Sequence, residues 1–414
     1  MPTAPESAVD PAPMPASRRP AAREADVLPG VRAVADEMIA LRHRIHAHPE
    51  LAYEEFETSD LVAARLAQWG YAVHRGLGGT GIVGTLKVGD GPKRLGLRAD
   101  MDALPIHEST GLPYASTVPG RMHACGHDGH TAILLAAARV LARERGFEGT
   151  LNLIFQPAEE GKGGAKRMMD EGLFEQFPCD AIFAMHNMPG LPQGHFAVRP
   201  GPTMASADNV TITLHGYGGH GAMPHRAQDP LVAAASLVMA LQTIVSRNVD
   251  PQQTAVVTVG ALHAGVANNV IPQTATLELS VRALDPAVRN LLEARIRAIA
   301  TAQAESFGVR AEINYQRGYP VLVNTAAEAE FACGVARDLV GDGRVEWNAA
   351  AVTGSEDFAF MLEKLPGCYF FIGNGDGDSA GACMVHNPGY NFNDDNIGVG
   401  SAMWVALTQR YLAV

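Results

Sequence analysis

The spacing of apolar residues predicts helices and strands that alternate along the first half of the chain. Between Val31 and His48 the large apolar residues recur every three or four positions, which is typical of a helix with one buried face. Two further helices are expected over Thr58–Trp69 and His130–Arg143. Short apolar runs typical of strands cover Gly81–Lys87, Arg94–Arg98, Thr150–Phe155 and Ala181–Met185. This alternation predicts an α/β sheet covered on both faces by helices.

The pattern changes between Asp208 and Gln316. Here the order is strand, helix, strand, strand, helix, strand. In chain order the segments are Val210–His215, Pro230–Arg247, Ala255–Leu262, Thr274–Arg282, Pro286–Phe307 and Arg310–Tyr315. This β-α-β-β-α-β order matches the ferredoxin-like split βαβ unit and predicts a compact inserted domain. Helices at Ala326–Val340 and Ile397–Leu412, with a strand at Cys368–Ile372, are expected to complete the first domain.

The length of the chain agrees with this division. A chain of 414 residues exceeds what one hydrophobic core usually supports. We expect residues 27–203 and 317–414 to form the α/β domain and residues 204–316 to form the insertion. Residues 1–26 are rich in Pro and Ala and contain few large apolar side chains, so we expect a disordered tail.

Charge and composition narrow the partners and the compartment. The formal net charge is −12 and the Lys and Arg residues are scattered, which argues against nucleic acid and anionic membranes as partners. The apolar run Thr131–Leu141 is interpreted as the longest, and it is far shorter than the roughly 20 residues of a membrane span. No apolar stretch follows Arg18 and Arg19, as an export signal would require. Five cysteines without regular spacing favour a reducing compartment, so we expect a cytoplasmic protein.

A cluster of potential metal ligands precedes the third predicted helix. The segment Met122–His130 contains one thiol and three imidazoles. Thiolate and imidazole are the usual ligands of zinc and of neighbouring transition metals. We assign Cys125 and His127 to a metal, and we interpret His123 and His130 as residues that cap or pack the helix.

Further polar residues follow the ends of predicted strands. Asp100 and Asp102 follow the strand Arg94–Arg98, while Glu159, Glu160 and His186 follow the next two. In α/β sheets, ligands bind beyond the carboxyl ends of the strands, so these side chains are expected to meet.

The adjacent glutamates suit two tasks at such a site. Pro157 ends the strand pairing, so both Glu159 and Glu160 can turn to one side. One carboxylate can bind metal while the other takes a proton from water. A solvated glutamate pair on a loop remains the alternative from the residues alone.

Five motifs, in this order, resemble the hippurate hydrolase, aminoacylase and auxin-conjugate hydrolase group of dinuclear metallopeptidases. The resemblance extends from about residue 30 to the C-terminus. The motifs are Leu97–Pro105, His123–His130, Gln156–Gly161, Gly354–Phe358 and His386–Pro388. The resemblance implies a mixed-sheet catalytic domain with an inserted ferredoxin-like domain that acts as a lid and in dimerisation.

The resemblance also implies roles for individual residues. Its metal ligands correspond to Cys125, His127, Glu160, His186 and His386. They would hold two divalent ions, manganese or zinc, although cobalt and nickel accept the same donors. Glu159 matches the general base, and Asp102 would orient a ligand imidazole. Related peptidases have His at the position of Asp100 and a bridging Asp at that of Cys125, so this chain follows the cysteine-containing branch.

The insertion has a motif of its own at Gly218–His225. The resemblance implies that His220 reaches the active site of a partner subunit and stabilises an oxyanion, in a homodimer or higher homo-oligomer. Asn269 and Arg282 resemble positions that hold the carboxylate of the substrate. From the residues alone, His220 would be interpreted as an ordinary loop histidine. For Arg282 the alternative is a surface ion-pair partner.

The predicted activity is metal-dependent cleavage of the amide bond of an N-acyl amino acid. Three alternatives remain. The first is deacetylation of a biosynthetic intermediate such as N-acetyl-diaminopimelate. The second is a cysteine hydrolase with Cys125 as nucleophile and His127 as base, although two residues so close on one loop are poorly placed for this. The third is a metal-binding protein without catalysis, which has no need of Glu159.

Overall fold

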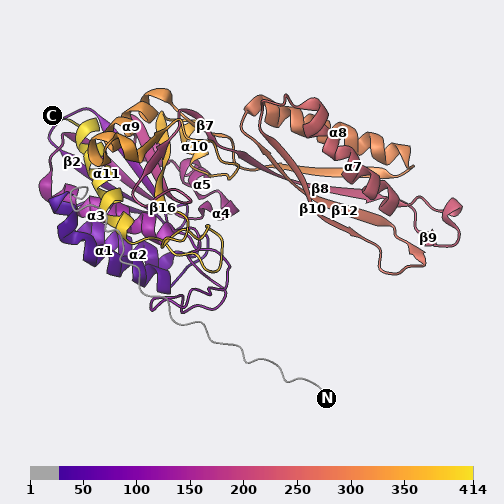
Figure 1. Cartoon of the computed structure of the whole chain (residues 1–414), viewed down its shortest axis with the longest axis horizontal. Helices are drawn as coiled ribbons and strands as arrows, with labels where there is room; N and C mark the ends of the chain where they lie inside the picture. The colour runs from indigo at the N-terminus through magenta and orange to yellow at the C-terminus, as the bar shows by residue number, and fades with distance from the viewer. Residues whose placement is uncertain (1–27, 414) are drawn as a thin grey trace, which may run out of the picture.

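The computed structural model describes residues 28–413, which form two lobes (Figure 1). The tail predicted over residues 1–26 lies outside the described residues. The first lobe contains both ends of the described chain. The second lobe is the continuous segment from the start of β8 (Ser206–His215) to the end of β13 (Arg310–Arg317). The expected domain boundaries, at residues 204 and 316, lie beside the two crossings of the chain between the lobes.

The first lobe is built on a mixed sheet of eight strands. The strands, in spatial order, are β1 (Ala72–Leu77), β2 (Gly81–Val88), β4 (Gly149–Gln156), β3 (Arg94–Asp100), β5 (Ala181–Pro189), β16 (Gly367–Gly375), β6 (Phe196–Val198) and β15 (Val345–Trp347). The central strands β4, β3, β5 and β16 are parallel, and β2 and β6 pair with them antiparallel on either side. The carboxyl ends of these parallel strands therefore share one edge of the sheet.

Helices cover both faces of this sheet, as predicted. Five long helices share one core: α1 (Pro29–Ala47), α2 (Phe56–Gln68), α3 (His127–Glu144), α9 (Ala326–Val340) and α11 (Asp395–Tyr411). Three short helices share the other: α5 (Gly164–Asp170), α6 (Leu173–Gln176) and α10 (Ala359–Leu362). Alternation along β4 makes this possible, because Leu153 and Phe155 face the first core and Ile154 faces the second.

The second lobe is an antiparallel sheet of four strands with two helices. The strand order is β10 (Ala255–Ala264), β12 (Thr274–Ala283), β8 and β13. Helices α7 (Pro230–Asn248) and α8 (Pro286–Ser306) pack with this sheet in one core. Each helix starts with a proline after an aspartate, Asp229 or Asp285, that accepts backbone N–H groups. The predicted β-α-β-β-α-β order is confirmed.

The helix α7 is more apolar than the sequence analysis recognised. Within residues 28–413 it is the one helix with the length and hydropathy of a membrane span. The expectation that residues 131–141 form the longest apolar run is therefore wrong. One face of α7 packs against the lobe, through Ala233, Leu237, Leu241 and Ile244. Its other face exposes Leu231, Val232 and Met239, and exposed apolar clusters mark interaction surfaces.

Candidate metal centre

The predicted meeting of the strand ends is confirmed. Strands β4, β3 and β5 lie next to one another and run parallel. Asp100 is the last residue of β3, Glu159 follows β4 after a short turn, and His186 lies in the carboxyl half of β5. Cys125 and His127 approach the same place from the start of α3.

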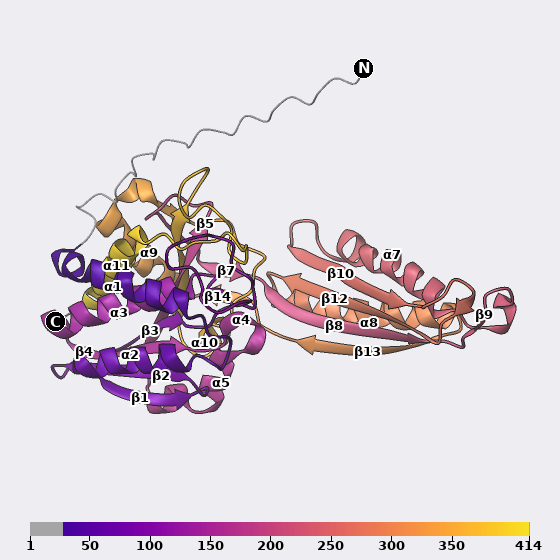
Figure 2. The ribbon, with the colours of Figure 1, turned by 90° about the horizontal axis from the view of Figure 1, so that it is seen from below.

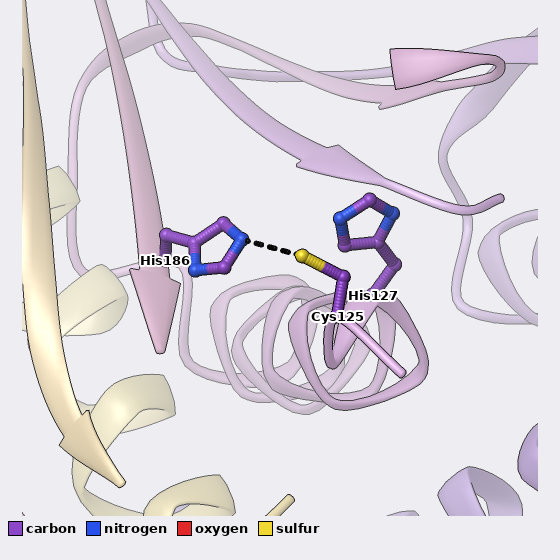
Figure 3. Close-up of side chains that lie close together, drawn as sticks. All are labelled: Cys125, His127 and His186. Carbon is purple, nitrogen blue, oxygen red and sulfur yellow. Dashed lines mark hydrogen bonds between the residues drawn. The ribbon is translucent and has the colours of Figure 1, made fainter. Parts of the chain in front are cut away.

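The five predicted ligands form two adjoining groups of donor atoms. The donor atoms of Cys125, His127 and His186 lie within 4.8 Å of one another, as do those of Cys125, Glu160 and His386. The Cys125 Sγ atom lies 3.4 Å from His186 Nε2 (Figure 3), and Glu160 Oε1 lies 3.3 Å from His386 Nε2. Cys125 belongs to both groups, so its sulfur is placed to be shared by two ions.

One buried ligand atom has unused bonding capacity. Among residues 28–413, His127 Nε2 has no hydrogen-bond partner. A buried polar atom without a partner typically costs about 1–3 kcal/mol. The His127 ring is oriented by Asp102, whose Oδ1 lies 3.2 Å from Nδ1, so Nε2 is directed to the donor groups. This free nitrogen, with the thiol and the other imidazole donors, fits a divalent transition metal.

The protonation of the proposed ligands Cys125 and His127 is consistent with cations bound between the two donor groups. Burial raises the pKa of the Cys125 thiol, and the carboxylates of Glu160, Glu159 and Asp100 raise it further. Burial opposes protonation of His127, but Asp100 and Asp102 outweigh it and raise the pKa of this imidazole to about 10. Excess negative charge therefore holds protons on both donors, and bound cations would replace those protons.

The backbone at the start of α3 positions Cys125. Gly126 has a φ of +91°, and a Cβ at this position would lie 2.4 Å from both Asn187 Nδ2 and Tyr390 Oη. Asn187 Nδ2 donates to the carbonyl oxygen of Cys125 (2.7 Å), and the Tyr390 hydroxyl donates to Asn187 Oδ1 (2.7 Å). Only glycine fits this approach.

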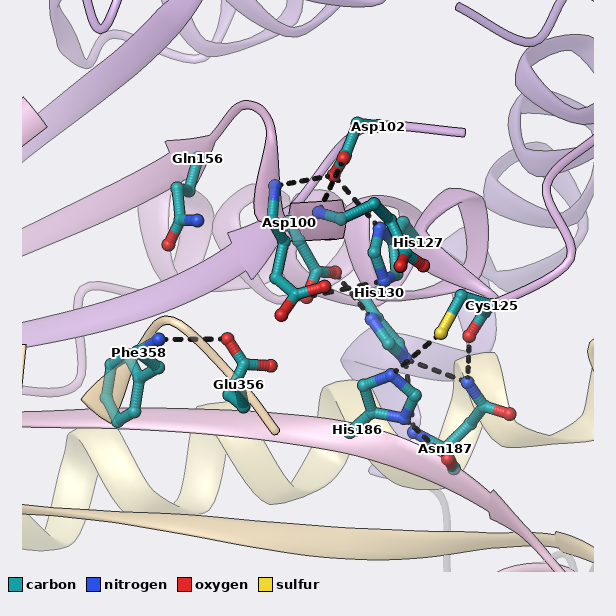
Figure 4. Close-up of polar contacts among 12 residues, drawn as sticks. Asp100, Asp102, Cys125, His127, His130, Gln156, His186, Asn187, Glu356 and Phe358 are labelled. Carbon is teal, nitrogen blue, oxygen red and sulfur yellow. Dashed lines mark hydrogen bonds and ion pairs between the residues drawn. The ribbon is translucent and has the colours of Figure 1, made fainter. Parts of the chain in front are cut away.

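Asp102 also holds the glutamate pair. Its carboxylate accepts the backbone N–H groups of Glu159 (3.1 Å) and Glu160 (3.0 Å). Figure 4 shows Asp102 beside the His127 ring. One carboxylate thus fixes both the His127 ring and the backbone of Glu159 and Glu160.

The histidines interpreted as packing residues are both buried. His130 Nδ1 donates to Asp100 Oδ1 (2.6 Å), and His130 Nε2 accepts the Asn187 N–H (3.1 Å). The ring nitrogens of His123 have no partner among residues 28–413, and burial lowers the pKa of this imidazole to about 4.

Glu159 lies among carboxylates that the sequence analysis left without a role. Carboxylate oxygens of Glu159, Glu356 and Asp357 lie within 4.8 Å of one another, and burial followed by Glu356 raises the pKa of Glu159 well above its usual range. The buried Arg98 guanidinium donates to Glu356 (2.8 Å) and to Asp357 (3.2 Å). The adjacent acids in the motif Gly354–Phe358 were the available signal for this network.

The three residues proposed in the second lobe do not lie together. His220 and Asn269 are neighbours at the far tip, where the short strands β9 (Gly219–His220) and β11 (Val270–Ile271) pair. Figures 1 and 2 show this tip at the end of the lobe away from the first lobe. The ten residues of β8 span about 30 Å between the two ends. A single chain in this arrangement does not bring His220 to Cys125.

Arg282 lies at the opposite end of the lobe. Its Nη1 donates to Ser355 Oγ of the first lobe (2.8 Å). Ser355 precedes Glu356, which places Arg282 on the side of its own chain's donor cluster.

Comparison with known proteins gives one consistent family. Residues 96–410 match peptidase family M20/M25/M40. A hippurate hydrolase of Campylobacter jejuni is 45% identical, over 94% of this chain and 100% of the relative. An N-acetyl-L-cysteine deacetylase of Bacillus subtilis is 38% identical, over 87% of this chain and 85% of the relative.

A solved structure agrees with the site as well as the fold. The Bacillus subtilis YXEP protein, described as a dinuclear metal binding peptidase, is 33% identical with a TM-score of 0.79. The match covers 92% of this chain and 99% of that one. The resemblance inferred from the five motifs is thereby confirmed, and two metal ions are supported by this structure and by the two donor groups. The chain belongs to peptidase family M20/M25/M40.

Proposed function

We propose that this protein is a metal-dependent amidohydrolase that cleaves N-acyl amino acids to a carboxylic acid and a free amino acid. The observation that carries the proposal is the placement of the buried Glu159 beside two donor groups that share Cys125. The relatives named for hippurate hydrolysis and for N-acetyl-L-cysteine deacetylation support this substrate class.

The metal ligands divide between two ions. We assign Cys125, His127 and His186 to one ion and Cys125, Glu160 and His386 to the other. Manganese or zinc is proposed, and cobalt or nickel fits the same donors. When bound, such ions polarise a carbonyl group and lower the pKa of water.

Glu159 is assigned as the general base. Glu160 lies in the group with Cys125 and His386, whereas Glu159 lies in no group with Cys125 and is close to His127 and Glu356. We assign to Glu159 the removal of a proton from water and its transfer to the leaving amine, because its buried carboxylate lies beside His127. Asp102 orients His127 and fixes the backbone of Glu159.

The second lobe is assigned to substrate binding and to assembly. Arg282, which donates to Ser355 of the first lobe, is assigned to bind the substrate carboxylate in its own chain. His220 and Asn269 are assigned to the site of a partner subunit, where His220 would donate to the developing oxyanion. The exposed apolar face of α7 and the free edge of β10 support a homodimer or higher homo-oligomer formed through this lid lobe.

The alternative of a thiol nucleophile is disfavoured by the geometry. The Cys125 sulfur faces His186 rather than the proposed base His127, and its raised pKa keeps the thiol protonated. We propose the cytoplasm as the location, since all five cysteines are free. No residue of the site specifically favours N-acetyl-diaminopimelate.

A substrate panel tests the proposed activity. The protein, loaded with manganese or zinc, is incubated with N-acetyl, N-benzoyl and N-indoleacetyl amino acids, and release of the free amine is measured. Release from at least one of these classes is expected, and Glu159→Gln with intact metal content should abolish most of it. No amine release from any of them by metal-loaded protein would contradict the proposal.

A further inference from the structure

The turn that carries Glu159 and Glu160 has one strained residue. Ala158, Gly161 and Gly163 have φ angles of 56°, 72° and 69°. Glycine adopts this left-handed conformation freely, but it costs Ala158 roughly 1–2 kcal/mol because of its Cβ. The turn therefore depends on contacts from outside to keep its shape.

The first lobe supplies several of these contacts. Four of its side chains bond to the turn: Glu55 accepts the Ala158 N–H (2.9 Å), Asp102 accepts the Glu159 and Glu160 N–H groups (3.1 and 3.0 Å), Asp357 accepts the Ala165 N–H (2.9 Å), and Tyr53 donates to the Lys162 carbonyl (2.9 Å). These contacts leave the carbonyl of Glu159 and the amide of Gly163 to another partner.

Tyr319 is that partner. Its hydroxyl donates to the carbonyl oxygen of Glu159 (2.6 Å) and accepts the N–H of Gly163 (3.0 Å). The ring packs edge-on against Phe360, with centroids 6.0 Å apart. One phenol group thus bridges the two sides of the turn.

The main chain of Tyr319 lies in the crossing that follows β13 and is hydrogen-bonded to the start of the second lobe. The Ala207 N–H at the start of β8 donates to the Tyr319 carbonyl (3.0 Å), and the Gly318 N–H donates to the Ala207 carbonyl (3.0 Å). Gly318 is also held by Asp208, which is paired with Arg289 of α8 at 2.5 Å. Tyr319 is therefore anchored to the sheet and helix of the second lobe while its hydroxyl holds the turn of the first.

We propose that Tyr319 is a positioning residue that ties the orientation of the second lobe to the backbone carrying Glu159. A movement of the lobe would shift this crossing through its hydrogen bonds to Ala207 and Asp208, and would thereby move the Tyr319 hydroxyl and the Glu159 carbonyl. Substrate that binds between Arg282 and the metal centre would thereby set the general base. This inference rests on the proposed role of Glu159.

The variant Tyr319→Phe tests the tie, with Tyr53→Phe as its matched control. Both remove a phenol hydroxyl that contacts the same turn, but Tyr53 belongs to the first lobe. For metal-loaded Tyr319→Phe we expect faster hydrogen exchange in residues 158–165, unchanged metal content and a kcat for hippurate lower by about 10-fold or more, because small misplacements of catalytic groups are costly. KM should change by less than about two-fold, and Tyr53→Phe should keep kcat within about two-fold.

The coupling itself is tested by adding hippurate to protein that cannot turn it over. In Glu159→Gln, hippurate should slow exchange in residues 158–165. The same addition should have no such effect when Tyr319→Phe is also present. Equal effects of Tyr319→Phe and Tyr53→Phe on exchange and kcat would overturn the proposal. So would exchange that hippurate still slows in the double variant, or a loss of kcat explained entirely by lost metal. Failure of the wild-type protein to hydrolyse any substrate would instead count against the proposed function, and the exchange of unliganded Tyr319→Phe would still test the contact.

Discussion

At the scale of single residues, Cys125 has the most demanding position. It contributes to both donor groups, and a thiolate sulfur is large and polarisable enough to serve two cations. Without cations, burial and three nearby carboxylates keep its pKa high. If two ions bind as proposed, the thiol would release its proton, and occupancy of one group would be coupled to occupancy of the other.

Substitutions of the two neighbouring glutamates, Glu159 and Glu160, are expected to have different effects. Glu159→Gln should retain two metal ions and lose roughly 10²–10⁴-fold in kcat, because Gln cannot accept a proton from water. Glu160→Gln should lose metal, since a donor of one group is weakened. Metal analysis of purified protein beside turnover of hippurate separates the two effects. Reversed phenotypes would show that the roles of the two residues are exchanged.

The meeting of Asp100, Glu159 and His186 was predictable because strand ends meet at one edge of a parallel sheet, whereas His386 was expected only from the resemblance. The hydrogen-bond network around Arg98 was not predictable from the sequence. Arg98 lies on β3, but its partners Glu356 and Asp357 follow 258 and 259 residues later, and local spacing carries no information on such a pairing. Tyr319 was missed for the same reason, since it meets Glu159 across 160 positions.

At the scale of elements, the start of α3 determines whether Cys125 and His127 face the site. Gly126→Ala would force a Cβ onto Asn187 and Tyr390 at 2.4 Å in a left-handed backbone. We expect a loss of about 2–4 kcal/mol in the free energy of unfolding and weaker metal binding, from backbone strain and overpacking together. Urea unfolding and metal titration measure the two effects.

Gly70→Ala is the control for backbone strain alone. Gly70 has a similar φ of +87°, and a Cβ there meets nothing within 4 Å. This variant should lose only about 1 kcal/mol and bind metal normally. A Gly126→Ala protein as stable and as metal-competent as Gly70→Ala would show that the close approach to Asn187 is not needed.

Long elements with clear periodicity were predicted within a few residues, and short or polar ones were missed. Strand β1 was not predicted, because its sequence Ala72–Leu77 shows no apolar run or alternation and only Leu77 is buried at this edge of the sheet. Strands β9 and β11 contain two residues each and depend on pairing with one another. No local pattern marks such elements, because tertiary contacts create them.

At the scale of the whole molecule, His220 lies far from the metal centre of its own chain, so its proposed role requires a second subunit. If His220 acts in a partner subunit, His220→Ala and Glu159→Gln should rescue each other in mixed dimers. One site would then combine an intact His220 with an intact Glu159, while its twin would have neither. His220→Ala alone should cost about 10²–10³-fold in turnover, by analogy with other oxyanion donors.

Subunit exchange should restore up to about a quarter of native activity, because about half of the dimers are mixed and each has one restored site. A tagged subunit reports that exchange took place. If activity stays absent after exchange, His220 acts in its own chain or plays no part in turnover. The fold of this lobe was predictable from the sequence. The metal centre that the tip with His220 would approach was not, because it depends on how two chains assemble.

The central claim is that two metal ions bound by this one cluster make the protein an amidohydrolase. Titration of the metal-free protein with manganese or zinc tests it most directly, with hippurate hydrolysis and bound metal measured at each step. Activity should be absent at the start and should saturate at about two ions per chain, one for each donor group. Full turnover by protein shown to contain no metal would contradict the account.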